Sequence, residues 1–260
     1  MEQERADEWI RKIRADPTDW GLRGVYADEL QEAGDGRGEF IALQLQGSDD
    51  ERVRSLFREH GSRWLGLDLS RALTGVEFRG GFLDRASLAA RSALDVAGWS
   101  RAWLDPRLAT LSRLDRGRGD LGLYTSFVTS PAMGGLRDVE VAAPVVLDAL
   151  LSCESARAIQ VLRFPGALPS PSRLAQIAKS PVFEGLAEVG IGVLSAATVA
   201  EQLRRAIETL RRHGLTRVKR IQLSPSALSR LSVEGAERDL LLVAFGPGCV
   251  RPPEASAAGA

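Results

Sequence analysis

Hydrophobic residues in the first 60 positions recur at intervals of three and four, with polar residues between them. This spacing is that of amphipathic helices, and it occurs in a series of short segments. The clearest segment has its apolar residues on one face, at Leu22, Val25, Tyr26, Leu30 and Ala33. Asp19 can cap that helix and Gly34 can end it, and a later segment ends at Gly61. We therefore predict an all-helical domain over residues 1–63.

Beyond Trp64 the pattern changes to short apolar runs that alternate with amphipathic segments. This order is typical of parallel strands that are joined by helical crossovers. Within the runs one spacing recurs, in which two residues and then one residue separate three apolar positions. It occurs at Leu73/Val76/Phe78, Leu136/Val139/Val141, Ile159/Leu162/Phe164, Leu186/Val189/Ile191, Val218/Ile221/Leu223 and Leu240/Val243/Phe245, with a looser copy at Leu108/Leu111.

These runs follow one another at distances of 22 to 35 residues. Most of the distances lie in or near the period of roughly 20 to 29 residues of leucine-rich repeats, although the asparagine of the usual repeat consensus is missing. We therefore predict an α/β fold, a short and irregular leucine-rich-repeat-like solenoid of six or seven units over residues 64–246, behind the N-terminal helical cap. Residues 247–260 are rich in Pro, Ala and Gly, and we expect a disordered tail.

The charges of the chain balance, with 34 basic and 34 acidic side chains, which argues against a protein built to bind nucleic acid or an anionic membrane. They are unevenly distributed. Residues 1–60 carry 15 acidic and 9 basic side chains, and residues 201–220 carry 2 acidic and 7 basic ones. Both segments are interpreted as solvated helix faces, and a docking surface is the alternative.

The two cysteines, Cys153 and Cys249, lie far apart and form no disulfide framework. The charged N-terminus has no apolar core of a signal peptide, and no run approaches 18 uninterrupted apolar residues. We expect a soluble cytoplasmic protein. All five tryptophans fall within the first 103 residues, where core packing is the default expectation and an exposed aromatic docking patch the alternative.

Residues 34–40, GDGRGEF, are rich in glycine, as are many phosphate and metal loops. A P-loop requires a Lys followed by Ser or Thr, an EF-hand requires an oxygen ligand where Arg37 stands, and a dinucleotide loop requires a preceding strand. Because none of these conditions is met, we interpret the segment as a turn between two helices. The residues of this structural turn are Asp28, Gly34, Asp35, Arg37, Gly38 and Glu39.

Arg37 stands between two groups of carboxylates, one before the turn and Glu39 after it. We expect a salt-bridged pin that holds the two helices at a fixed angle. The alternative is a guanidinium that binds the carboxylate of an external ligand.

No catalytic residue, metal site or cofactor site is predicted. His60 and His213 each precede a glycine at an expected helix C-terminus, where an imidazolium stabilises the helix dipole. The sequence contains neither GxSxG nor HExxH. A hydrolase or transferase with a site assembled from distant residues is the least favoured class, and a pocket lined by His60, Cys153 or clustered carboxylates would support it.

Residues 16–46, DPTDWGLRGVYADELQEAGDGRGEFIALQLQ, closely resemble the repeat-companion domain of myxobacteria and planctomycetes, whose usual form contains RLVYADWLEERGDPRGEFIRLQ. Glu29 and Gly36 depart from that form, which usually has Trp and Pro there. The family's domain commonly precedes leucine-rich-repeat-like regions, so the resemblance implies repeats after it, and residues 76–88 look like the strand that opens such a region. The family implies no catalytic residues.

We expect a non-enzymatic protein-binding or scaffold module that acts through the strand face, where side chains between the apolar positions point outward. Those side chains are Glu77, Asp138, Glu140, Arg163, Glu188, Arg220 and Gln222. The alternative is a nucleic-acid-associated factor that binds through a basic patch. The same patch could instead bind an anionic protein or the acidic N-terminal segment of another copy of the chain. Its residues are Arg204, Arg205, Arg211, Arg212, Arg217 and Lys219, continuing to Arg220.

Overall fold

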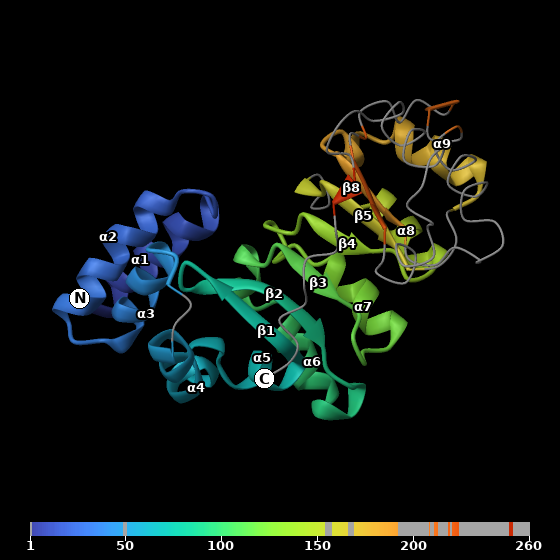
Figure 1. Cartoon of the computed structure of the whole chain (residues 1–260). Helices are drawn as coiled ribbons and strands as arrows, with labels where there is room; N and C mark the ends of the chain where they lie inside the picture. The colour runs from blue at the N-terminus through green and yellow to red at the C-terminus, as the bar shows by residue number, and fades with distance from the viewer. Residues whose placement is uncertain are drawn as a thin grey trace. The chain divides into compact units, whose positions relative to one another are not determined.

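The structure is a computed structural model, which describes residues 2–48, 51–153, 158–165 and 169–191, together with 208, 211–212, 218, 220–223 and 250–251 (Figure 1). The chain has the predicted α/β fold, with a mostly parallel sheet. It divides into two compact units, Met1–Leu136 and Arg137–Ala260.

The first unit begins with the predicted helices. They are α1 (Glu2–Ala15), α2 (Trp20–Glu32), α3 (Gly36–Leu45) and α4 (Glu51–Leu65), and a short helix that was not predicted, α5 (Leu67–Ala72), follows them. The carboxylate of Asp19 accepts a hydrogen bond from the Leu22 N–H at 3.1 Å and so caps α2. Asp35 caps α3 in the same way, through the Arg37 N–H at 2.9 Å. Gly34 has a φ of 73°, as expected where α2 ends.

A β-hairpin follows the helices and was not predicted. Strand β1 (Leu73–Arg79) pairs antiparallel with β2 (Phe82–Leu88), whereas the sequence pattern predicted only parallel strands. The turn between them is Gly80–Gly81, with φ values of 55° and 80°. Positive φ at both central residues matches the turn to the twist of a hairpin, and glycine adopts it without strain.

The remainder of the first unit returns to parallel pairing. The chain passes through η1 (Arg91–Ala93), α6 (Val96–Trp103) and η2 (Pro106–Thr110) to β3 (Arg113–Asp115), which pairs parallel with β2, and then to α7 (Leu121–Val128). The looser strand pattern at Leu108/Leu111 was wrong. Leu108 lies in η2, which Asp105 caps and Pro106 begins, and the strand starts two residues after Leu111.

The hairpin belongs to the core of the helical domain. Phe82 packs with Ile13, Tyr26, Ala27 and Ile41 in one buried cluster. A second cluster around Phe40, Val53, Leu56 and Trp64 has Phe78 of β1 packed against it. For this reason the predicted end of the domain at residue 63 differs from the structure, in which α4 continues to Leu65 and the first compact unit to Leu136.

From β4 to β6 the second unit alternates strands and helices, as the sequence pattern predicted. Its elements are β4 (Asp138–Glu140), α8 (Pro144–Leu151), β5 (Val161–Phe164), α9 (Pro171–Lys179), η4 (Pro181–Phe183), β6 (Glu188–Ile191), β7 (Arg220–Leu223) and β8 (Val250–Arg251). All pairings from β4 to β8 that the structure describes are parallel.

The strands β4 to β7 are in register at the predicted apolar positions. Val139 lies opposite Leu162, Leu162 opposite Val189, and Val189 opposite Ile221. Val139, Leu162 and Val189 are buried, with at most 2% of each exposed. The run Leu240/Val243/Phe245 lies outside the described residues.

The predicted tail enters the sheet at one point. Val250 and Arg251 form β8 and pair with Ile221 and Gln222 of β7, whereas disorder was predicted over residues 247–260. Strand pairing depends on backbone groups that every non-proline residue has, so a sequence poor in core-forming residues can still extend a sheet. The other residues of the predicted tail lie outside the described part of the chain.

Candidate functional site

The predicted strand-face residues of the second unit lie on the side of the strands opposite the apolar row. Arg163 Nε donates to Asp138 Oδ1 at 2.6 Å, and the two side chains are only 16% and 20% exposed. Arg163 also lies over Gly190 of β6, where a Cβ would come within 2.7 Å of Arg163 Cγ. Glu188 is 4% exposed and Glu140 is half-buried. Most of this predicted surface is therefore engaged within the protein.

Two further predicted residues of this face, Arg220 and Gln222, lie in β7. Their backbones are in register with Glu188 and Gly190 of β6. The side chains of β7 lie outside the described part of the structure.

The predicted strand-face residue of the first unit is more accessible. Glu77 lies opposite Arg85 on the hairpin, its side chain is 62% exposed, and 3.9 Å separate Glu77 Oε2 from Arg85 Nε. On β3, Arg113 Nε lies 3.2 Å from Asp115 Oδ2. The three strands of this unit therefore carry charged side chains in register, with Glu77 opposite Arg85 and Arg85 opposite Arg113.

The prediction that Arg37 forms a salt bridge with nearby carboxylates was wrong. Arg37 Nη2 donates to the carbonyl oxygen of Gly81 at 3.3 Å, and the guanidinium lies over the Phe82 ring, 5.1 Å from its centroid. Arg37 therefore links α3 to the hairpin, because the Gly-Gly turn brings a carbonyl within its reach. The carboxylate of Glu39 pairs instead with Arg52 of α4, at 2.5 Å from Nη2.

The other predicted turn residues lie in α2, in α3 or between these two helices. Asp28 is exposed on α2. Gly38 lies where α3 meets α2, and a Cβ there would come within 2.6 Å of both Ala27 O and Gln31 N. The chain turns where Gly34 ends α2 and Asp35 caps α3, whereas Arg37, Gly38 and Glu39, which were predicted as turn residues, lie within α3.

Two residues that were not predicted also bind the hairpin backbone. Arg23, which is 4% exposed, donates to the carbonyl oxygens of Arg79 and Pro17, and its guanidinium lies between the rings of Trp20 and Phe82. Gln44 donates to Phe78 O at 3.0 Å and accepts from the Gly81 N–H at 2.8 Å. Arg23 could have been found from its spacing, because it falls three and four residues before the buried Tyr26 and Ala27.

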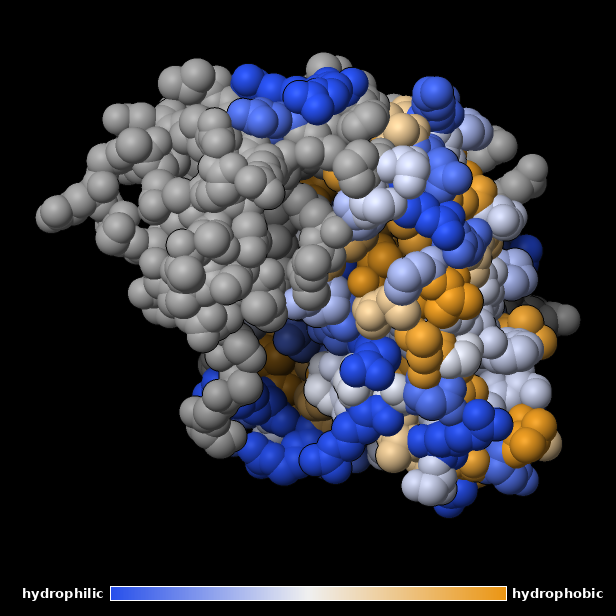
Figure 2. Space-filling view, turned by 90° about the vertical axis from the view of Figure 1, so that its right-hand side faces the viewer, coloured by the Kyte–Doolittle hydropathy of each residue, from blue (hydrophilic) through white to orange (hydrophobic). Residues whose placement is uncertain are grey.

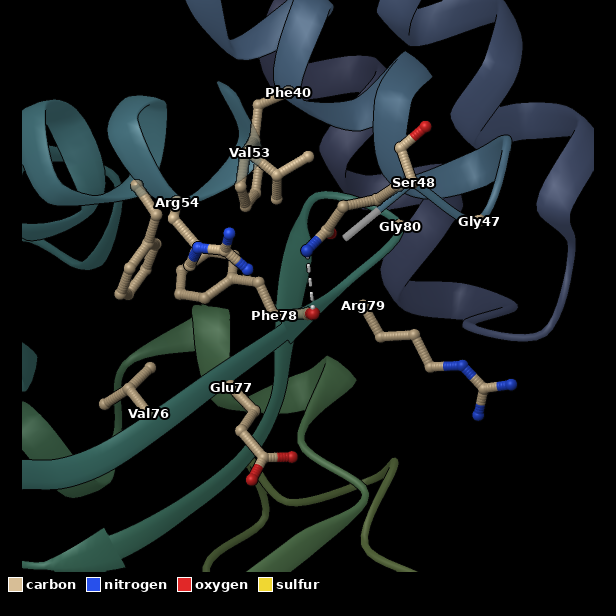
Figure 3. A pocket seen from close by; sticks show the side chains of 12 residues that line it. Phe40, Gly47, Ser48, Val53, Arg54, Val76, Glu77, Phe78, Arg79 and Gly80 are labelled. Carbon is tan, nitrogen blue, oxygen red and sulfur yellow. Dashed lines mark hydrogen bonds between the residues drawn. The ribbon is translucent and has the colours of Figure 1, made fainter. Parts of the chain in front are cut away.

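A cavity of about 390 Å³ lies beside these contacts, between α3, α4 and the hairpin (Figure 3). Its apolar wall is formed by Phe40, Val53, Phe57 and Phe78. Gln44 donates to the Phe78 carbonyl at 3.0 Å at one side of the cavity, and Figure 3 shows the Arg79 side chain extending away. We call this space the hairpin cavity.

His60 was expected at the C-terminal end of a helix, but it lies inside α4. Helix α4 continues to Leu65, and Gly61 lies inside it, where a Cβ would come within 2.7 Å of the Phe57 ring. The absent side chain makes room for Phe57, so Gly61 serves packing and does not stop the helix. The His60 ring lies 5.8 Å from that of Trp64.

The structure describes only some residues of the predicted basic patch. Arg211 and Arg212 are helical and exposed, whereas Arg204, Arg205, Arg217, Lys219 and His213 lie outside the described residues. Within the described residues, no cluster of three or more His, Cys, Asp and Glu side chains could hold a metal ion, and Cys153 is half-buried. No described helix has the length and apolar character needed to span a membrane.

Exposed hydrophobic residues are dispersed over the described surface. On the face drawn in Figure 2 they gather in small groups among hydrophilic residues. The large ones are Trp20, Val25, Leu67, Val96, Leu104 and Val145. Trp20 is 42% exposed and holds two guanidiniums, those of Arg23 and Arg79, against its ring. Trp64 and Trp99 are buried, as core packing predicted.

Comparison of the chain with protein-family models, with curated proteins and with solved structures found no match. The resemblance of residues 16–46 to the repeat-companion domain therefore stays a prediction from the sequence.

Proposed function

We propose that the chain is a non-enzymatic protein-binding module, a leucine-rich-repeat-like solenoid behind a helical cap that recognises its partner through the charged face of its strands. The observation that carries the proposal is the register of β4 to β7, which aligns apolar residues on one face and charged or polar ones on the other. In a solenoid the strand face is the usual extended binding surface.

The distances between equivalent strand positions support the repeat. Val139, Leu162, Val189 and Ile221 follow one another at 162 − 139 = 23, 189 − 162 = 27 and 221 − 189 = 32 residues. The first two distances lie within the roughly 20 to 29 residue period of leucine-rich repeats, and the third slightly exceeds it. Each strand pair from β4 to β6 is joined by a connection that contains a helix, α8 or α9.

On the described part of the predicted strand face, Glu77 is exposed and Glu140 is half-buried. Asp138, Arg163 and Glu188 are engaged or buried, so their substitution would disturb the sheet as well as the surface. Glu77 is 62% exposed at its side chain and Glu140 half-buried. A partner with a basic surface would complement these carboxylates, which mainly raises the association rate and the specificity.

The test is affinity capture from the native cytoplasm, followed by titration of the purified partner against three variants. Charge reversal by Glu77→Lys and by Glu140→Lys should each weaken the affinity about tenfold, which corresponds to about 1.4 kcal/mol. Glu184→Lys is the matched control, because Glu184 is exposed but lies after η4, away from the strands. Equal affinities for all three variants would refute recognition through the strand face.

A further inference from the structure

A second cavity in the first unit, of about 270 Å³, has four arginines in its wall. They come from four different elements: Arg14 from α1, Arg37 from α3, Arg63 from α4 and Arg107 from η2. The only carboxylate among the described lining residues is that of Asp35. We call this space the arginine cavity.

Two of the four positive charges have no carboxylate partner among the described residues. Arg107 is paired, because Asp105 accepts from its Nε at 2.8 Å and from its Nη2 at 2.5 Å. Arg63 is exposed and forms no ion pair with a described residue. Arg37 donates from its side chain only to Gly81 O, and its buried Nε has no hydrogen-bond partner in the described structure. The cavity therefore holds an excess of positive charge.

The surroundings of Arg37 make this excess costly. Burial lowers the pKa of the Arg37 guanidinium below its ordinary value, and the nearby charge of Arg107 acts in the same direction, against Tyr26 and Asp35. A buried charge with unfilled hydrogen bonds is unfavourable, whereas an anion beside it would fill them. Trp64, Phe78 and Phe82 also line the cavity, and such apolar walls strengthen an electrostatic attraction inside it.

We propose that the arginine cavity binds a small oxyanionic ligand, through one phosphate or carboxylate group held between Arg37 and Arg63. The planar fork of a guanidinium matches both groups in a bidentate way. The Asp35 carboxylate accepts a hydrogen bond from the Arg37 backbone N–H and so caps α3. It forms no hydrogen bond with the Arg37 guanidinium in the described structure, so that guanidinium can bind the ligand. The site is independent of the strand face, so either proposal can fail alone.

The experiment is isothermal titration calorimetry of the full chain with inorganic phosphate and, separately, with succinate, each against sodium chloride of the same ionic strength. We expect saturable binding of at least one of them. Arg63→Gln should weaken it about tenfold, because one charge-assisted contact is lost. Arg58→Gln is the matched control, since Arg58 lies on the same helix, is exposed and pairs with Glu51 outside the cavity.

The two probes distinguish the two ligand groups. Binding of phosphate alone identifies a phosphate ligand, and binding of succinate alone a carboxylate ligand. Arg37→Lys, which keeps the charge but loses the fork, should also weaken binding, and circular dichroism will show whether that variant folds. The absence of saturable binding by either probe, or equal affinities of Arg63→Gln and Arg58→Gln, would overturn the proposal.

Discussion

The two compact units use their polar and charged side chains in different ways. In the first unit Arg23, Arg37 and Gln44 reach from the helices to backbone groups of the hairpin, across 34 or more residues of sequence in each case. In the second unit the charged residues of the described strands pair laterally, as Arg163 does with Asp138 of the neighbouring strand. In the first unit these side chains link distant segments of the chain to one another. In the second unit they pair on the surface of a sheet that its buried apolar residues already stabilise.

The difference arises from the strand connections. Parallel strands in register satisfy their backbone groups with one another, so side chains are free to pair on the surface. The carbonyls of Phe78, Arg79 and Gly81, in and beside the hairpin turn, accept hydrogen bonds from side chains of α2 and α3, and buried carbonyls require donors. The helices supply those donors, which explains why Arg23 is one of the few buried charged residues in the described structure.

The largest effect is expected at Arg23. Arg23→Ala should lower the free energy of unfolding of the first unit by about 3 kcal/mol, because it leaves buried carbonyls without a donor. All five tryptophans lie in this unit, so tryptophan fluorescence during urea unfolding reports on it. Arg11→Ala, at an exposed position on α1, is the control. A loss equal to that of the control would show that the hairpin does not depend on this cross-link.

A smaller effect is expected in the second unit. Asp138→Asn should cost about 1 kcal/mol, because it removes one charge of a partly buried pair while the apolar row stays intact. The change should appear in urea unfolding followed by far-ultraviolet circular dichroism and leave the tryptophan transition in place. Glu184→Gln provides a comparison at an exposed site of the same unit. If the fluorescence transition moves by the same amount, the two units unfold together and the contrast between them fails.

The smallest effect concerns the exposed pair of Glu39 and Arg52. The hydrogen bond from Arg52 holds the pKa of Glu39 below its ordinary value, and burial opposes this slightly. A depressed pKa in the folded state adds stability above the unfolded value of about 4.3, and this stability is lost as the pH falls through the folded value.

The small stability advantage of the wild type over Glu39→Gln, measured by tryptophan fluorescence in urea, should therefore be present at pH 7 and be smaller at pH 3. Glu32→Gln controls for removal of an exposed carboxylate on the preceding helix. An advantage that is the same at both pH values would contradict the pairing of Glu39 with Arg52.

Local signals predicted much of this fold. Asp19 caps a helix as its position indicated, because capping depends on a few neighbouring residues. The strands around Val139, Leu162 and Val189 were found because a buried row imposes its own alternation on the sequence. These features require little knowledge of distant parts of the chain.

The errors concern choices that only tertiary structure decides. Arg37 has carboxylates nearby in sequence, yet its partner is a carbonyl 44 residues away. Gly61 resembles a helix stop, but the Phe57 ring needs the space inside α4. The hairpin could have been predicted from the Gly80–Gly81 dipeptide between two apolar runs, which is a known turn signal. The arginine cavity had no local signal, since its four arginines come from four separate elements.

The contact of Gln44 with β1 also bears on how the protein behaves at high concentration. β1 is the outermost strand of its sheet, and exposed outer strands are where molecules join edge to edge and aggregate. The Phe78 carbonyl of β1 is already bonded to Gln44, and α3 and α4 supply the apolar neighbours of this strand. The same short helix that follows the glycine-rich turn thereby covers part of the edge at which two molecules could otherwise join, a consequence that is separate from any role in recognition.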